Sequence, residues 1–236
     1  MTDRFKLLVF DWDGTVMDSV PRIVACIRAA IQDLGLEARS EGAIRNIIGL
    51  GLREAIDTLF PGQDDGFHQR FTDCYRHYFL GADPTPAVLF PSADTVLQTL
   101  HEEGYLLAVA TGKGRRGLDK VLEESGLREL FHVTRCADET RSKPHPQMLL
   151  EIMDELAVAP EHTLMIGDTE YDMEMANNAQ AFALAVTYGV HERARLLRHN
   201  PLGSVDAISE LPGWLRQGRG ASAAAFPGLG QAATGG

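Results

Sequence analysis

The chain has 236 residues, and 22 lysine and arginine residues against 33 acidic residues give it a formal net charge of −11. This length suits one large domain or one core with a sizeable insertion, and a hydrophobic content of 44% is enough to fill a globular core. The acid excess argues against a nucleic-acid-binding protein, because contacts to nucleic-acid phosphates need clustered lysine and arginine.

Short apolar runs bounded by polar residues or glycine predict buried strands. In chain order they cover residues 7–10, 106–110, 133–136, 164–166 and 182–186. Helical patterns alternate with most of them, which is typical of strands that are covered on both sides. We therefore predict an α/β fold, a Rossmann-like core of parallel strands with helices on both faces of the sheet.

The stretch between the first two runs is different. It has no comparable strand and carries apolar residues at helical spacing instead. We predict that residues 17–82 form an inserted all-helical cap domain and that residues 1–16 and 83–216 form the core. The alternative is that these helices simply cover the sheet. Residues 217–236 are rich in Gly, Ala, Ser and Gln, which predicts a disordered tail.

The lengths of the apolar runs and the spacing of the cysteines indicate the cellular compartment of the protein. No apolar run is long enough for a signal peptide or a membrane helix. The three cysteines are widely spaced, without a Cys-x-x-Cys pair, which favours reduced thiols over a disulfide framework or a zinc site. We expect a cytoplasmic protein with no membrane or nucleic-acid partner.

Polar residues follow three of the predicted strands at the point where each strand ends. In open α/β sheets the ligand crevice lies outside the carboxyl ends of the strands, so we expect these residues to meet. Grouped carboxylates need a cation, and hard oxygen ligands without His or Cys select Mg²⁺. A lysine and backbone N–H groups would complete a site for a phosphoryl group. The residues are Asp11, Asp13, Thr111, Gly112, Lys143, Asp168 and Asp172.

These residues stand in motifs that resemble the four motifs of the haloacid dehalogenase-like hydrolases, in the same order and at similar spacings. The motifs are Asp11-Trp-Asp13-Gly14-Thr15, Thr111-Gly112, Lys143 and Gly167-Asp168-Thr-Glu-Tyr-Asp172. The helical insertion resembles the subclass with a helical cap, which includes phosphoglycolate phosphatases and β-phosphoglucomutases. The resemblance implies a Mg²⁺-dependent phosphatase, a monomer or homodimer. It would hydrolyse a small phosphorylated metabolite, phosphoglycolate-like or a sugar phosphate, through an aspartyl-phosphate.

The resemblance also implies roles for the residues. Asp11 would be the nucleophile and Asp13 the general acid and base. The Thr111 hydroxyl, the Gly112 N–H and Lys143 would bind the phosphoryl oxygens. Asp11, the backbone carbonyl of Asp13 and Asp168 would hold Mg²⁺, and Asp172 would orient Lys143 or a metal-bound water.

Other interpretations stay open. A phosphomutase or phosphotransferase of the β-phosphoglucomutase type would use the same motifs, and a non-catalytic phosphate-binding module would keep only the pocket. Arg45 and Gly49 lie in a stretch that resembles the cap loop facing the active site of the family. Arg45 is suited to contact a carboxylate or a hydroxyl of the substrate, with an exposed helix arginine as the alternative. For the basic run at 113–116 we favour a solvated loop over a site for an anionic substrate.

Overall fold

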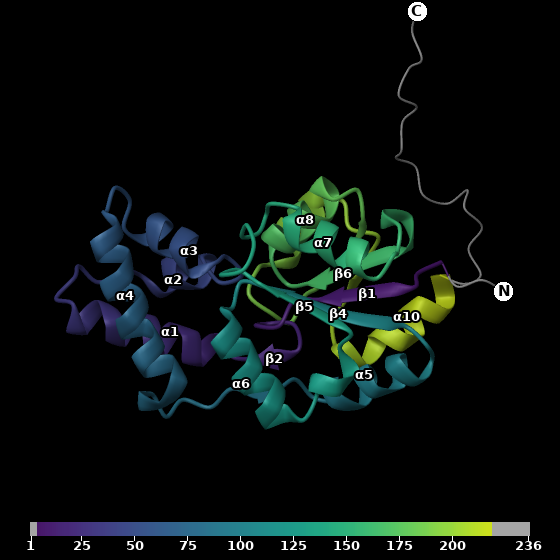
Figure 1. Cartoon of the computed structure of the whole chain (residues 1–236), viewed down its shortest axis with the longest axis horizontal. Helices are drawn as coiled ribbons and strands as arrows, with labels where there is room; N and C mark the ends of the chain where they lie inside the picture. Colours follow the sequence, from purple (N-terminus) through teal and green to yellow (C-terminus); the bar gives the residue numbers. More distant parts are fainter. Residues whose placement is uncertain (1–3, 219–236) are drawn as a thin grey trace, which may run out of the picture.

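The computed structural model describes residues 4–218, and its centre is a six-stranded sheet with the order β5-β4-β1-β6-β7-β8 (Figure 1). All neighbouring strands are parallel. The strands are β1 (Leu7–Phe10), β4 (Leu106–Thr111), β5 (Val133–Cys136), β6 (Thr163–Gly167), β7 (Phe182–Val186) and β8 (Ser204–Val205). The sequence predicted all of these except β8, which is two residues long and too short to produce a recognisable apolar run.

Successive side chains of the strands point to opposite faces of the sheet. In β1, Leu8 and Phe10 pack into one apolar cluster, while Leu7 and Val9 pack into another. The first cluster lies against α5 (Ala93–Glu102), α6 (Arg115–Ser125) and α10 (Leu211–Gly218). The second lies against α7 (Gln147–Glu155), α8 (Glu170–Asn178) and α9 (Arg193–Leu196).

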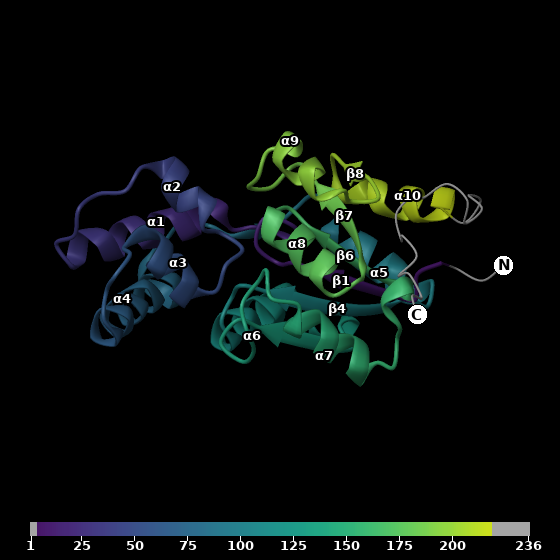
Figure 2. The same ribbon diagram turned by 90° about the horizontal axis from the view of Figure 1, so that it is seen from above.

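The helices accordingly form a layer on each side of the sheet. Figure 1 places α7 and α8 on one side and α5 and α10 on the other, and Figure 2 shows α7, α8 and α9 over the strands. Burial on both faces explains why the strands have unbroken apolar runs rather than alternating ones. The predicted Rossmann-like α/β fold is confirmed.

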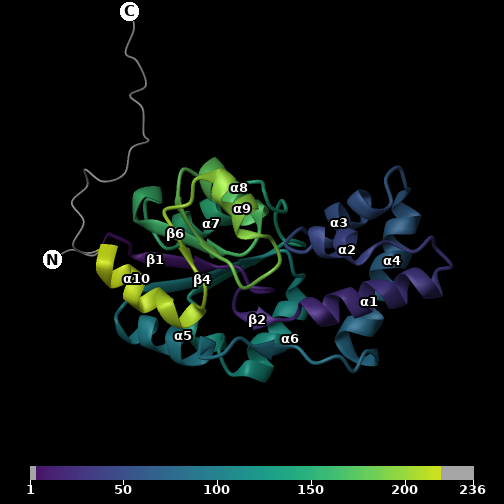
Figure 3. The ribbon, with the colours of Figure 1, turned by 180° about the vertical axis from the view of Figure 1, so that it is seen from behind.

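The insertion after β1 folds around an apolar cluster of its own. Its helices are α1 (Val20–Asp33), α2 (Glu41–Asn46), α3 (Leu52–Leu59), α4 (Asp65–His77) and the π-helical turn η1 (Tyr78–Ala82). Every buried member of this cluster comes from these helices or the turns between them. Figure 3 shows the inserted helices at one end of the molecule, opposite to α10. We call α1–α4 and η1 the inserted helices.

The chain enters and leaves the inserted helices through two short strands. These are β2 (Met17–Asp18) and β3 (Val88–Leu89), which pair in antiparallel orientation. The sequence did not predict them, because two residues carry no periodicity. The division of the chain at residues 17 and 82 into cap and core stays a prediction.

Short 3₁₀ turns connect the remaining elements: η2 (Arg128–Leu130), η3 (Pro160–His162), η4 (Leu197–His199) and η5 (Ile208–Glu210). Helix α10 continues to Gly218, so the first two residues of the predicted tail belong to a helix. The rest of that tail, residues 219–236, lies outside the described residues. Across residues 4–218, no helix combines the length and apolar character that crossing a membrane requires.

Candidate active site

The carboxyl ends of three adjacent strands bring the predicted residues together. Phe10 at the end of β1 pairs with Val109 of β4 and Ile166 of β6, so the residues that follow lie at one edge of the sheet. Asp11, Thr111 and Asp168 are therefore neighbours, and all three side chains are buried. Strand β1 lies between β4 and β6, the point where the chain changes its direction across the sheet, and ligands bind at such points in α/β folds.

Lys143 links two of the carboxylates. Its Nζ lies 2.8 Å from Oδ1 of Asp11 and 2.6 Å from Oδ1 of Asp172. Burial lowers the pKa of Lys143, but the two carboxylates outweigh this effect and hold its pKa above the usual value. The side chain is fully buried and charged, so it places a fixed positive charge beside Asp11.

Asp172 also caps the helix that carries it. Thr169 is the N-cap of α8, and Oδ2 of Asp172 accepts hydrogen bonds from the Thr169 N–H at 3.0 Å and the Thr169 hydroxyl at 2.7 Å. One carboxylate oxygen thus completes a capping box while the other contacts Lys143. Asp172 therefore serves both the helix end and the site.

Asp168 is held by contacts that the sequence did not reveal. The Thr15 hydroxyl donates to its Oδ1 at 2.8 Å, and the Val190 N–H donates to its Oδ2 at 2.7 Å. A Cβ at Gly14 or Gly189 would overlap the same carboxylate. Gly14 has φ +84°, a conformation that favours glycine. Gly189 and Val190 follow β7, far from any motif, and only the fold places them here.

The carboxylates fit a divalent cation. Asp11, Asp168 and Asp172 are buried and offer oxygen atoms that all lie within 4.8 Å of one another. Oδ2 of Asp11 is buried and has no hydrogen-bond partner among the described residues. Burial, together with the charge of Asp172, raises the pKa of Asp11 to about 7 despite Lys143. Burial and the charges of Asp11 and Asp172 raise the pKa of Asp168 well above its usual value. A hard cation would relieve this repulsion.

The Asp13 side chain has partners of its own. It accepts a short hydrogen bond from the Ser19 hydroxyl, and its Oδ1 lies 2.9 Å from Nζ of Lys113. Lys113 is 8% exposed, and its Nζ lies 4.3 Å from the centre of the Phe79 ring, a cation–π contact with the inserted helices. The expectation of a solvated loop is therefore wrong for Lys113. In the sequence, the signal for this buried position at the site was that Lys113 directly follows Gly112.

A cavity of about 910 Å³ lies above these residues, between the core and the inserted helices. Asp11, Asp13, Thr111, Gly112 and Lys143 line its floor from the core side. The inserted helices supply an apolar wall, formed by Ile23, Ile27, Ile47, Ile48, Leu52, Tyr75, Phe79 and Leu80. The cavity is large enough for a small metabolite.

The two predicted cap residues differ. Gly49 lines the cavity, has φ +102°, and leaves no room for a Cβ, which would lie 2.9 Å from Cγ2 of Thr169. Arg45 lies in α2 and is not among the described residues that line the cavity. The structure thus does not bring Arg45 to the cavity: Arg45 lies within α2, whereas Gly49 lies in the loop that follows this helix.

Hydrogen bonds hold residues 46–51, here called the cap loop, against the core. The Tyr171 hydroxyl donates to the Asn46 carbonyl at 2.7 Å, and Nη1 of Arg195 donates to Oδ1 of Asn46 at 2.6 Å. At the other end of the loop, the Gly51 N–H donates to the Ser142 hydroxyl at 2.6 Å. These contacts hold the loop over the site.

Known proteins share this sequence and architecture. The protein named "Probable phosphatase IndB" from Dickeya dadantii is 34% identical, over 88% of this chain and 92% of its own. A phosphoglycolate phosphatase from Psychrobacter arcticus is 30% identical, over 89% of this chain and 95% of its own. The crystal structure of a hydrolase from Pseudomonas syringae has the same fold, with a TM-score of 0.82 at 22% identity, and the match covers 90% of this chain and 98% of that one.

The family model described as "Haloacid dehalogenase-like hydrolase" matches residues 8–186, which is more than half of the chain. This range runs from β1 to the end of β7 and includes every residue of the four motifs. The chain belongs to the haloacid dehalogenase-like hydrolases.

Proposed function

We propose that the chain is a Mg²⁺-dependent phosphatase that hydrolyses the phosphate ester of a small metabolite. The observation that carries this proposal is the buried group at the strand ends. There Asp11, one of whose oxygens has no hydrogen-bond partner within residues 4–218, lies against a charged lysine and two further carboxylates, below a cavity of metabolite size. The phosphatase names of the relatives support the same conclusion.

In the proposed reaction, two aspartates carry out the chemistry. Asp11 attacks the phosphorus atom and forms an aspartyl-phosphate, while Asp13 gives a proton to the oxygen of the leaving alcohol. Asp13 then takes a proton from a water molecule, which attacks the phosphorus atom. This second step releases inorganic phosphate and restores Asp11.

The other residues stabilise charge during both steps. Lys143 balances the negative charge beside Asp11, and the Thr111 hydroxyl and the Gly112 N–H bind phosphoryl oxygens. Asp11, Asp168 and the Asp13 carbonyl would hold the cation, with Asp172 orienting Lys143. When bound, the cation supplies positive charge that neutralises the carboxylates and polarises the phosphoryl group.

Phosphate release tests this function. The purified protein should hydrolyse p-nitrophenyl phosphate and 2-phosphoglycolate, lose activity with a chelator and regain it with Mg²⁺. Asp11→Asn should lower kcat by at least ~10³-fold, because the nucleophile is gone. Asp154→Asn is the matched control, because Asp154 is an exposed residue of α7 away from the site. Turnover without any divalent cation, or a normal rate in Asp11→Asn, would overturn the proposal.

The mutase alternative has a separate readout. A phosphomutase would convert a hexose 1-phosphate to its isomer without releasing phosphate, whereas the proposed enzyme releases phosphate. The cytoplasmic location, the monomeric or dimeric state and the lack of a nucleic-acid partner stay predictions.

A further inference from the structure

The carboxyl group of Asp13 receives two contacts on one of its oxygen atoms. The Ser19 hydroxyl donates a short hydrogen bond to Oδ1 of Asp13, and Nζ of Lys113 lies 2.9 Å from the same atom. In a protonated carboxyl group, one oxygen accepts hydrogen bonds and the other carries the proton. Two donors at Oδ1 therefore favour Oδ2 as the oxygen that carries the proton.

Lys113 is held in this position from the side of the inserted helices. Its Nζ lies 4.3 Å from the centre of the Phe79 ring, a cation–π contact between the core and η1. Lys113 is 8% exposed and Phe79 is 5% exposed, so little water reaches this contact. A cation–π contact is stronger where the cation is removed from water. The ring therefore limits the positions that the ammonium group can take.

The Phe79 ring is itself fixed by its neighbours. It stacks on the ring of Tyr75, with the two ring centres 5.5 Å apart. Nη2 of Arg22 in α1 donates to the Phe79 carbonyl at 2.8 Å, and Cζ of Arg22 lies 5.3 Å from the ring centre. On the core side, Gly117 of α6 leaves room for the lysine stem, because a Cβ there would lie 3.0 Å from Cγ of Lys113. The lysine is thus enclosed between α6 and η1.

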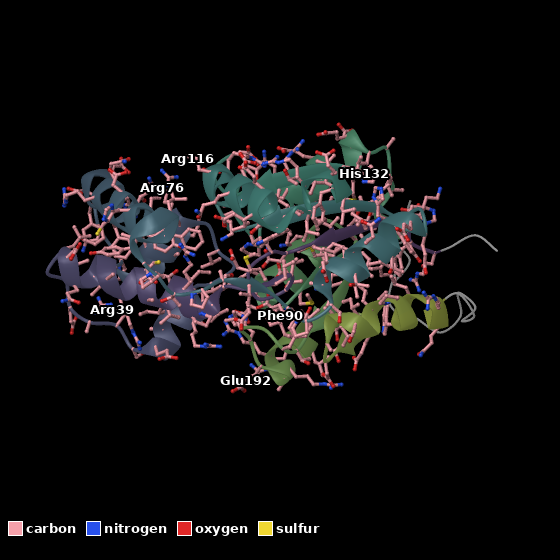
Figure 4. The ribbon with its side chains drawn as sticks, turned by 90° about the horizontal axis from the view of Figure 1, so that it is seen from below. Arg39, Arg76, Phe90, Arg116, His132 and Glu192 are labelled. Carbon is pink, nitrogen blue, oxygen red and sulfur yellow. The ribbon has the colours of Figure 1, made fainter. Side chains whose placement is uncertain are left out.

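Other charged groups at this junction are held more loosely. Nη2 of Arg76 in α4 lies 3.7 Å from Oδ2 of Asp138, and the two side chains are 42% and 40% exposed. Arg116 of α6 is exposed, and Figure 4 shows Arg76 and Arg116 at the junction between the inserted helices and the core. Exposed ion pairs contribute little because water screens them. The buried contact between Phe79 and Lys113 is better suited to hold a group in place.

We propose that Phe79 is a positioning residue for proton transfer. Its ring holds the Lys113 ammonium group against Oδ1 of Asp13, so that Oδ2 directs its proton at the ester oxygen. As Asp11 bonds to the phosphorus atom, the bond from phosphorus to this oxygen breaks and the proton of Oδ2 passes to the oxygen. The inference rests on the proposed function, because it assigns the position of the acid within that reaction.

The test compares two substrates of similar size that differ in their need for a proton. Benzyl phosphate releases a strongly basic alkoxide unless the oxygen is protonated, whereas p-nitrophenyl phosphate releases a weakly basic phenolate that leaves without a proton. The ratio of kcat/KM for benzyl phosphate to kcat/KM for p-nitrophenyl phosphate therefore reports the acid. Phe79→Leu should lower this ratio by about 10- to 100-fold, and so should Lys113→Met. A change that only weakens substrate binding affects both substrates and leaves the ratio unchanged.

Further variants show whether Phe79 acts through Lys113. The double variant Phe79→Leu/Lys113→Met should lower the ratio no further than Lys113→Met alone, because both changes remove the same contact. Phe79→Tyr keeps the ring and should keep the ratio within about threefold of the wild type. Phe79→Met, which is apolar but has no ring, replaces Phe79→Leu if thermal unfolding shows that the latter does not fold.

Phe67→Leu is the matched control for the loss of an aromatic ring. Phe67 is a buried residue of the inserted helices, 7% exposed, and is not among the described residues that line the cavity. This variant should lower the thermal stability of the protein without changing the ratio.

An unchanged ratio in folded Phe79→Leu would overturn the inference, as would single losses that multiply in the double variant. So would a ratio in Phe79→Tyr as low as that in Phe79→Leu. A wild type that hydrolyses p-nitrophenyl phosphate but not benzyl phosphate would also overturn it, because no acid would then be in place. Hydrolysis of p-nitrophenyl phosphate by the wild type reports the proposed function separately, since its absence would sink the phosphatase itself.

Discussion

Asp168 owes its orientation to backbone atoms of the loop that follows β7. The Val190 N–H donates to its carboxylate, and Gly189 packs directly against it. Together with the Thr15 hydroxyl, these two loop residues therefore fix the orientation of an expected metal ligand, as partners of metal ligands commonly do.

Gly189→Ala tests this dependence. The added methyl group would overlap the Asp168 carboxylate, so the carboxylate must move and give up the Val190 contact. We expect the Mg²⁺ concentration for half-maximal activity to rise by about 10- to 100-fold, with little change in kcat at saturating Mg²⁺. A Mg²⁺ titration of activity measures the shift. Gly213→Ala in α10 is the control, because its Cβ would meet nothing within 4 Å, and an unchanged titration in Gly189→Ala would contradict the argument.

The sequence predicted the motif residues but not the residues that hold them. Asp11, Thr111 and Asp168 stand at strand ends, and strand ends can be read from apolar runs. Gly189 and Lys113 depend on how loops fold back over the sheet, which no local pattern encodes. Arg45 is the opposite case. Its residue type and its closeness to Gly49 in the sequence suggested a substrate contact, yet it is not among the described residues that line the cavity.

At the scale of elements, the Asn46 end of the cap loop is fastened to two helices of the core, and its Gly51 end to Ser142 beside Lys143. Arg195 of α9 bonds to the Asn46 side chain and also forms an ion pair with Glu170 of α8. This arrangement joins α2, α8 and α9 at one point.

The paired strands β2 and β3 and the short β8 were not predictable, since each has only two residues.

Arg195→Ala should loosen the cap loop. Loss of the Arg195–Asn46 hydrogen bond leaves the Tyr171 and Ser142 contacts, so we expect closure to weaken without being lost. KM should rise by about tenfold, and amide exchange across residues 46–51 should become faster. Arg193→Ala is the matched control, because Arg193 lies on the same helix, is exposed and pairs only loosely with Asp206 at 3.6 Å. Unchanged exchange in Arg195→Ala would show that this contact does not hold the loop.

At the scale of the whole molecule, the buried carboxylates make stability depend on pH and on the cation. The pKa of Asp11 is raised from 3.8 to about 7, so the folded state binds more protons than the unfolded state between these values. The stability from this group is present below about pH 4 and is lost as pH rises through about 7. Without metal, the contribution of Asp11 should therefore make the protein less stable at pH 7.5 than at pH 5.5.

Thermal unfolding with and without Mg²⁺ checks this expectation. The rise in Tm on adding Mg²⁺ should be larger at pH 7.5 than at pH 5.5, because deprotonated carboxylates bind the cation better. In Asp11→Asn the difference between the two pH values should shrink. A Mg²⁺ effect of equal size at both pH values in the wild type would contradict the role given to Asp11.

The turn between Asp13 and α1 has a mechanical consequence. The Gly14 N–H bonds to the Met17 carbonyl, where the chain leaves for the inserted helices, and the hydroxyl of Ser19, the residue before α1, donates to the Asp13 carboxylate. A movement of α1 away from the sheet would therefore displace the Asp13 carboxylate, the group to which the proposed function assigns proton transfer. If the cavity opened to bulk solvent in this way, Asp13 would leave the position that the proposed proton transfer requires, so that the proposed aspartyl-phosphate would form and break down only in the closed molecule.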